Sequence, residues 1–289
     1  MDRTGKPQPQ PIVIGGREFR WGERTYIMGV INVTPDSFAG DGLGYDVSAA
    51  VARALRMREE GADIVDVGGE STRPGFEPVP LEEELRRVVP AVRLLSRELD
   101  IPVSVDTYKA AVAQAALEAG ASLINDIHGL RHDPQMAPLA ARYRVPVVAM
   151  HNQRGRPFRG VVQDVLAGWR ESLRLAEEAG LPREMVILDP GFNFGWQPEQ
   201  ALEMLRRLGE LREASGRPLL VGTSRKSTIG LVLGGLPVEE RLEGTAATVA
   251  LAIAQGADIV RVHDVKEMAR VARMADAIVR GWRHQEVAR

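Results

Sequence analysis

The sequence predicts an α/β protein whose main domain is a single (β/α)8 TIM barrel, with a short N-terminal β-hairpin before it. Short β-branched runs alternate with longer segments of helical periodicity, and eight such strand–helix units follow one another. The runs are almost continuously apolar, as expected of parallel strands that are covered on both faces. An open doubly wound sheet is the alternative, but the count of eight units favours the closed barrel.

The first elements lie before the barrel. Residues 1–11 are polar and proline-rich, lack the apolar run of a signal peptide, and are expected to form a loose leader. Residues 12–19, "IVIGGREF", predict the hairpin because two glycines provide a turn between two short runs. The expected barrel strands then are "YIMGVIN" (26–32), "ADIVDVGG" (62–69), "PVSVDT" (102–107), "SLINDI" (122–127), "PVVAMH" (146–151), "MVILDP" (185–190), "LLVGTS" (219–224) and "DIVRVH" (258–263).

A segment of helical periodicity follows each of these strands. Glycine marks several helix ends, in "EEGAD", "LEAGAS" and "AQGAD", because it takes the left-handed conformation that ends a helix before the next strand. No linker or shift in composition interrupts residues 12–289, which are therefore expected to form one domain. The expected helices span residues 47–60, 81–99, 109–119, 135–143, 162–179, 198–214, 238–255 and 265–281.

Composition excludes several functional classes. The 289 residues are 44% hydrophobic and 26% charged, with a net charge of −2, so no bulk nucleic-acid or membrane partner is indicated. The absence of cysteine excludes disulfides, zinc–thiolate sites and thiol nucleophiles. No apolar stretch reaches membrane-spanning length, and the expected location is the cytoplasm.

Polar side chains gather where the expected strands end. In a barrel of this kind the active site lies at the carboxyl ends of the strands. Residues from all eight units meet there: Asn32, Glu70 to Arg73, Asp106, Asn125, Asp126, His151, Asp189, Ser224 to Lys226, Arg261 and His263. Simple capping of strand ends predicts some of these residues, but it does not predict polar residues from every unit.

Individual residues have structural alternatives. Asp106 could cap the helix that follows it, and either Asn125 or Asp126 could accept hydrogen bonds from loop amides. Asp66 lies in the middle of a strand and is expected to be a buried polar support. His128 and His132 follow the fourth strand and are expected to be solvated.

Taken together, the strand-end residues predict a pocket with two chemical characters. Acceptors at Asp106, Asn125 and Asp189 suit a nitrogen-rich heterocycle. Donors at Arg73, Arg225, Lys226, Arg261 and His263 suit a phosphate or carboxylate group. Two loops rich in glycine and proline, residues 33–44 and 70–80, are expected to cover the pocket. Neither a P-loop nor a G-x-G-x-x-G fingerprint is present, and Asn32 could assist a Mg²⁺ ion held mostly by phosphate and water.

These segments resemble a known enzyme family. "GVINVTPDSFAGDG", "DVGGESTRPG", "SVDT", "INDI", "MH", "DPGFNFG", "GTSRKS" and "RVHDV" are similar, in order and spacing, to the motifs of dihydropteroate synthase, over about residues 26–266. The resemblance implies condensation of 6-hydroxymethyl-7,8-dihydropterin diphosphate with p-aminobenzoate, giving 7,8-dihydropteroate and pyrophosphate in folate biosynthesis. It also implies a Mg²⁺ cofactor, a homodimer and a target for sulfonamides.

The resemblance assigns roles to single residues. It implies that the pterin is held by Asp106, Asn125, Asp189 and Lys226, with Arg261 reaching the diphosphate beside His263 and Asn32, where Mg²⁺ would bind. It places p-aminobenzoate near Thr72, Arg73, Pro74, Phe194 and Ser227. The catalytic set would be Asp36, Asp106, Lys226 and Arg261, with the two aspartates stabilising positive charge on the pterin as diphosphate leaves.

Two segments depart from the family pattern, and three other functions are alternatives. The family usually has methionine after "MH", where this chain has "MHNQRGRPF", and often lysine after "GFxFG", where this chain has Trp196. A methyltransferase barrel that uses methyltetrahydrofolate would share the pterin contacts but would need no cationic diphosphate site. A non-catalytic pterin-binding homologue should have lost some of the cationic residues. A phosphosugar barrel should carry a glycine-rich phosphate loop after its last strands.

Overall fold

The computed structural model describes residues 9–34, 47–71 and 77–282. Within these residues, eight parallel strands form one sheet in the order β8-β7-β6-β5-β4-β3-β10-β9, and a parallel bridge from Leu188 to Leu219 joins its two edges. The closed barrel predicted from the sequence is therefore confirmed. Its strands are β3 (Tyr26–Asn32), β4 (Ile64–Gly68), β5 (Val103–Asp106), β6 (Leu123–Asp126), β7 (Val147–Met150), β8 (Val186–Asp189), β9 (Leu220–Val221) and β10 (Ile259–Val262).

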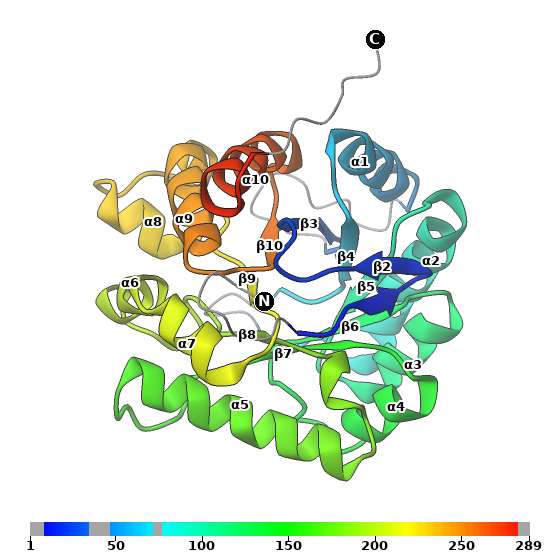
Figure 1. Cartoon of the computed structure of the whole chain (residues 1–289). Coiled ribbons are helices and arrows are strands. Elements are labelled where there is room, and N and C mark those ends of the chain that lie inside the picture. The colour runs from blue at the N-terminus through cyan, green and yellow to red at the C-terminus, as the bar shows by residue number, and fades with distance from the viewer. Residues whose placement is uncertain (1–8, 35–46, 72–76, 283–289) are drawn as a thin grey trace.

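Helices surround the ring of strands (Figure 1). They are α1 (Val47–Glu60), α2 (Leu81–Glu98), α3 (Ala110–Glu118), α4 (Met136–Tyr143), α5 (Val161–Glu178), α6 (Pro198–Arg206), α7 (Leu208–Ser215), α8 (Ser227–Val232), α9 (Leu242–Ala254) and α10 (Val265–Arg280), with 3₁₀ turns at Arg183–Met185 and Val238–Glu240. None of the helices in the described residues has both the length and the apolar character needed to cross a membrane.

Four details differ from the sequence-based expectation. The segment 198–214 is two helices, because Arg207 leaves helical geometry with φ −107° and ψ 17°. The segment 238–255 starts as a 3₁₀ turn before α9. The strand expected over 219–224 is shorter, since the chain turns after Gly222 and Arg225 takes a left-handed φ of 58°. The short helix α8 follows that turn and was not predicted.

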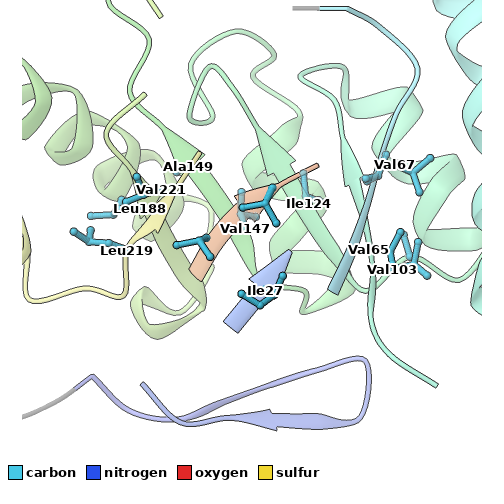
Figure 2. Close-up of a cluster of buried hydrophobic side chains, with 14 of the residues drawn as sticks. Ile27, Val65, Val67, Val103, Ile124, Val147, Ala149, Leu188, Leu219 and Val221 are labelled. Atoms are coloured by element: carbon cyan, nitrogen blue, oxygen red, sulfur yellow. The ribbon is translucent and has the colours of Figure 1, made fainter. Parts of the chain in front are cut away.

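Two apolar layers hold the barrel together. Side chains that point outward from the strands pack against the helices, and Figure 2 labels some of them, among them Ile27, Val65, Ile124 and Val221. The alternate positions point into the barrel, because successive side chains of a strand face opposite ways. At the amino-terminal end of the strands these inward positions are apolar: Tyr26, Met28, Ile64, Leu123, Val148, Ile187, Leu220 and Ile259.

The hairpin closes this end of the barrel. Strands β1 (Ile12–Ile14) and β2 (Arg17–Phe19) pair antiparallel around Gly15 and Gly16, as the sequence predicted, and cross the end of the ring (Figure 1). Ile12, Ile14, Phe19 and Trp21 join the inward layer of the strands in one buried cluster. The Phe19 ring lies 4.6 Å from that of Tyr26 and 6.1 Å from that of Trp21, centroid to centroid. The hairpin therefore completes the lower core of the barrel.

Phe19→Ala tests this closing role. The side chain is 2% exposed, and its removal should lower the free energy of unfolding by about 3–5 kcal/mol, since the rigid ring of strands cannot fill the cavity. The matched control is Val13→Ala on the same hairpin, where the side chain is 62% exposed and the change should stay below about 0.5 kcal/mol. Denaturant unfolding measures both, and equal effects would contradict a buried plug.

Candidate active site

A pocket lies at the carboxyl ends of the strands, opposite the hairpin. Its cavity of about 50 Å³ is lined by Asp106, Asn125, Ile127, Met150, Asp189, Phe194, Gly222, Ser224, Lys226, Arg261 and His263. Of the residues that the sequence predicts at the strand ends or in contact with a substrate, eight are in this lining. They come from five strands and the loops after them, so the parallel barrel brings them together as the sequence analysis expected.

Asn125 and Asp126 end the same strand but do different work. Asn125 faces the barrel, and its Nδ2 donates to Asp66 Oδ2 at 2.9 Å. Asp126 points the other way and accepts from the main-chain N–H groups of His128 (2.8 Å) and Leu130 (2.7 Å). Burial raises the pKa of Asp126 to about 6, although these two donors act against the shift. Asp126 is thus the residue that orders the loop, and Asn125 is left to serve the pocket.

Arg261 lies between two carboxylates at the base of the pocket. Its Nε donates to Asp66 Oδ2 and its Nη2 donates to Asp106 Oδ2, each at 2.7 Å. Asp66 is fully buried and acts as the polar support expected from its mid-strand position. Burial raises the pKa of Asp106 to about 7, and Arg261 acts against that shift. Burial alone would lower the pKa of Arg261, but Asp66 and Asp106 raise it overall.

The helix-capping alternative for Asp106 is wrong. The first N–H groups of α3 are satisfied elsewhere: Lys109 N donates to Thr107 Oγ1 at 3.2 Å, and Ala110 N donates to Asp133 Oδ2 at 2.8 Å. Asp106 instead accepts from Arg261. Its carboxylate is therefore directed into the site, where its charge can act on a ligand.

Asp189 and Lys226 form the other side of the pocket. Asp189 Oδ1 accepts from Gly191 N at 2.7 Å, and burial raises the pKa of Asp189 to about 6 against the opposing effect of Lys226. Burial lowers the pKa of Lys226 to about 8. Lys226 Nζ donates to Phe192 O at 2.6 Å and lies 4.5 Å from the centroid of the Phe194 ring. The carboxylate of Asp189, the amine of Lys226 and the ring of Phe194 thus line the same side of the pocket.

Ser227 stands beside this wall rather than in the cavity lining. It begins α8, and its Oγ accepts from Asn193 Nδ2 at 2.8 Å, while Thr228 Oγ1 donates to Asn193 Oδ1 at 2.8 Å. Asn193 itself has a left-handed φ of 68°. These bonds tie the loop that carries Phe194 to the start of α8, so the aromatic ring has a fixed backbone behind it.

His263 and Arg225 differ in their relation to the pocket. His263 lines it, and its Nδ1 lies 2.9 Å from Ser224 Oγ. Arg225, which the sequence analysis grouped with the phosphate donors, is absent from the lining and makes a bidentate pair with Asp264 at 2.9 and 2.5 Å. The expectation that Arg225 is a phosphate donor of the pocket is therefore wrong, because its guanidinium is paired with the Asp264 carboxylate.

Asn32 lies at the edge of the same region. A Cβ built on Gly68 would lie 3.7 Å from Asn32 Oδ1 and 3.6 Å from Asp106 Oδ2. Both oxygens therefore lie next to the space that the missing side chain of Gly68 leaves free. Among the described residues there is no group of three or more His, Asp or Glu side chains that could hold a metal ion. The donor set fits a Mg²⁺ ion with one protein oxygen and otherwise phosphate and water ligands.

Some expectations concern parts of the chain outside the described residues. Asp36 belongs to the first of the two glycine-rich loops, and Thr72, Arg73 and Pro74 belong to the second. Described residues do lie on both sides of the second loop. Glu70 accepts from Lys109 Nζ (2.7 Å), Tyr108 OH (2.7 Å) and Val79 N (2.9 Å), which joins the start and the end of that segment to the two residues just before α3.

Sequence reasoning missed part of the lining and misplaced one histidine. Ile127, Met150 and Gly222 line the pocket, whereas His151 is buried outside it, with Nε2 2.9 Å from Gln153 Oε1. The alternation of inward and outward residues could have revealed this. Val148 faces the barrel interior, so Met150, two residues later, faces it as well, whereas His151 faces the other way.

Comparison with known proteins decides the family. The sequence pattern of the pterin-binding enzymes matches residues 28–263. The dihydropteroate synthase of Clostridium beijerinckii is 53% identical over 268 residues, which make up 92% of this chain and 99% of the relative. The chain belongs to the dihydropteroate synthase family. The transferase activity and folate-pathway function expected from the sequence are therefore confirmed.

Solved members of the dihydropteroate synthase family have the same architecture. The Clostridium difficile enzyme, determined in the presence of pteroic acid, has a TM-score of 0.86 and 49% identity, and the match covers 91% of this chain and 99% of that one. The Xanthomonas albilineans enzyme with 4-aminobenzoic acid has a TM-score of 0.87 and 42% identity, covering 94% and 98%. Both relatives therefore share the barrel architecture of this chain.

The shifted pKa values predict how pterin binding depends on pH. Asp189 has a pKa raised to about 6, so it is ionised and a full acceptor above that pH and loses acceptor capacity below it. Asp106, at about 7, adds to the same acid limb. Lys226, at about 8, loses its charge above that pH. Calorimetry with a pterin ligand from pH 5 to 9 should give a bell-shaped affinity, whereas constant affinity over this range would refute the assignment.

Proposed function

We propose that this pocket joins 6-hydroxymethyl-7,8-dihydropterin diphosphate to p-aminobenzoate, with the pterin ring held between Asp189, Asn125 and Lys226. One observation carries the proposal: buried or half-buried acceptors and half-buried cations line the same small cavity. The acceptors match the N–H edge of a pterin, and the cations match the diphosphate that leaves from its side chain. Pteroic acid and 4-aminobenzoic acid, named with the two solved relatives, support the same substrates.

Each polar group of the pterin has a proposed partner. The Asp189 carboxylate accepts from the ring N3–H and the 2-amino group. Asn125 uses one N–H on Asp66 and keeps its carbonyl oxygen and second N–H for the adjoining ring edge. Lys226 donates toward O4 and N5, and Ile127 and Met150 provide apolar contacts beside the ring. The alternative, a methyltransferase that uses methyltetrahydrofolate, would need no cationic diphosphate site, whereas Lys226, Arg261 and His263 line this pocket.

The reaction needs a stabilised leaving group more than a base. The bond from the pterin methylene carbon to the diphosphate oxygen breaks, and the neutral arylamine nitrogen attacks that carbon and then releases its proton to solvent. Arg261, Lys226 and His263 offset charge on the departing diphosphate, while Asp106 and Asp36 offset positive charge on the pterin. When bound at Asn32, Mg²⁺ supplies further charge neutralisation to the diphosphate.

The arylamine is proposed to lie against Phe194, beside Lys226 and Ser227. The ring of Phe194 is fixed by its loop and offers an aromatic face next to the amine of Lys226. Thr72, Arg73 and Pro74 are proposed to complete this part of the site from the second glycine-rich loop. Because the arylamine meets the pterin methylene from this side, the two substrates can occupy the pocket together.

The activity assay tests the proposal directly. Purified protein is supplied with the pterin diphosphate, p-aminobenzoate and Mg²⁺, and dihydropteroate and pyrophosphate are both measured. The two products should form in equal amounts.

Asp189→Asn puts an amide donor against the ring N–H groups and should weaken pterin affinity by roughly 2–5 kcal/mol. The control is Asp100→Asn, which changes an exposed carboxylate outside the pocket. Affinity within a few-fold of the parent for Asp189→Asn would refute the assigned pterin contact.

We also propose that the protein is a cytoplasmic homodimer that pairs through α8, α9 and α10. These three helices lie on one side of the molecule (Figure 1) and carry most of the exposed large apolar residues of the described chain. The residues are Leu231, Val232 and Leu233 on or just after α8, Leu251 on α9, and Met274 and Ile278 on α10, with exposures of 43–68%. An apolar group of this kind is typical of a subunit interface.

Leu251→Asp tests the proposed dimer surface. A buried carboxylate at the centre of an apolar interface should shift the protein toward monomer by at least tenfold in dissociation constant. Sedimentation velocity at several concentrations measures the shift. Val13→Asp on the hairpin, also 62% exposed, is the matched control and should leave the association state unchanged. An unchanged dimer in the Leu251 variant would place the interface elsewhere.

A further inference from the structure

A second cavity lies beside the candidate active site and shares none of the lining residues described above for the pterin pocket. Its volume is about 220 Å³. It is lined by His128, Arg131, His132, Asn152, Arg154 and Arg156, which come from the loops that follow β6 and β7. Three guanidinium groups, two imidazoles and one amide therefore meet around a space large enough for a small anion.

Positive charge exceeds negative charge around this cavity. The acids beside it are Glu171, Asp126 and Glu70. Glu171, on α5, lies 3.1 Å from Arg156 and 3.8 Å from Arg131, so one half-exposed carboxylate serves two guanidiniums. Asp126 is occupied by two main-chain N–H groups, and Glu70 by Tyr108 and Lys109. A negatively charged ligand would balance the remaining charge.

Two side chains of the lining, one buried and one half-buried, have donors that are not fully satisfied. Asn152 is 5% exposed; its Oδ1 accepts from Arg154 N at 3.1 Å, but its Nδ2 has no hydrogen-bond partner among the described residues. Arg131 donates to His128 O (2.7 Å) and Met150 O (3.3 Å), and within the described part of the chain its Nη1 has only the long 3.8 Å ion pair with Glu171. Buried donors without acceptors are rare, and a ligand with several oxygens would satisfy them.

The loop that carries Asn152, Arg154 and Arg156 is fixed by Gln153. The Gln153 side chain lies 2.9 Å from His151 Nε2 and donates to Pro157 O at 3.1 Å, and its main-chain O accepts from Arg156 N at 3.0 Å. Its main-chain N donates to Phe194 O at 3.0 Å. The cationic loop is therefore preorganised, and it is joined to the residue proposed to contact the arylamine. The Arg154 guanidinium lies 4.9 Å from the centroid of the Phe194 ring.

We propose that this cavity is a second oxyanion site, which binds phosphate or diphosphate separately from the pterin pocket. A phosphate group offers several oxygens and up to two negative charges, which match the guanidiniums and unpaired donors better than one carboxylate does. Two sources share this chemistry: free inorganic phosphate, and the diphosphate released by the reaction. Only the second source rests on the proposed function.

The two histidines provide a reporter inside the site. The rings of His128 and His132 lie 5.0 Å apart, and each contacts Tyr108 edge-on. Burial, followed by the charges of His132, Arg131 and Arg154, lowers the pKa of His128 to about 4. A bound dianion opposes the positive charges, so it should raise this pKa and shift the ring resonances. The sequence contains five histidines, and single substitutions assign each resonance.

The test is a titration of the full-length protein with inorganic phosphate, followed by a separate titration with diphosphate, without Mg²⁺. Histidine ring NMR should show a saturable shift at His128, and its midpoint should be unchanged when a pterin ligand fills the main pocket. The double variant His132→Asn/Arg156→Gln should weaken binding at least tenfold. Arg174→Gln on α5, an exposed arginine paired with Glu178, is the matched control and should bind as the parent does.

Each outcome decides the matter. If phosphate binds more tightly than diphosphate, free phosphate is the occupant; if the order is reversed, the released product is. A saturable His128 response in protein that forms no dihydropteroate in the activity assay would support this site while refuting the proposed function. Circular dichroism verifies that each variant is folded. No saturable response, the same response in the double variant, or a stronger response to glutarate than to phosphate would overturn the proposal.

Discussion

The ion pairs of Arg261 with Asp66 and Asp106 are the interactions on which the rest of the site depends. They lie inside the barrel, where neither carboxylate can be left without its cation except at high cost. Their arrangement fixes three strands against one another, since Arg261 is on β10, Asp66 on β4 and Asp106 on β5. Asn125 joins the same group through Asp66. Removal from water also raises the pKa of Asp106 and Asp189 and lowers that of Lys226, so burial in the barrel sets the charges that meet a ligand.

The interior of the barrel is polar at the carboxyl-terminal ends of the strands and apolar at their amino-terminal ends. The inward positions of the strands change character along the barrel axis, from Ile64 to Asp66 on β4 and from Leu123 to Asn125 on β6. The hairpin adds Phe19 and Trp21 beneath the apolar layer, so the amino-terminal end contributes packing and the carboxyl-terminal end carries the chemistry. This division follows from the two-residue period of a strand, because one step of two residues moves the inward side chain from the core into the site.

The sequence alone predicted the barrel, the hairpin and most of the pocket, because these depend on local patterns: apolar runs, helical periodicity and polar residues at strand ends. What it missed depends on partners distant in the chain or on the exact phase of a strand. Arg225 was grouped with the phosphate donors because its pairing with Asp264 is visible only after the barrel closes. Met150 was passed over in favour of His151, since the inward phase of β7 needed Val148 as a reference. The break at Arg207 has no local signal such as proline or glycine at that residue.

The two departures from the family pattern form one packed unit. Gly191 and Gly195 bring the β8 loop against the β7 loop: a Cβ on Gly191 would lie 1.9 Å from His151 O, and one on Gly195 would lie 2.4 Å from Arg154 N. Only glycine allows this approach, and the hydrogen bond from Gln153 N to Phe194 O depends on it. Trp196 is 8% exposed and packs on His151, with ring centroids 5.6 Å apart. Asn152, Arg154 and Trp196 therefore belong to one packed region at the rim of the barrel. This region contacts the active site at Phe194, through the hydrogen bond from Gln153 N to Phe194 O and the contact of the Arg154 guanidinium with the Phe194 ring. The strand-end residues that line the pterin pocket are the ones that the family pattern predicts.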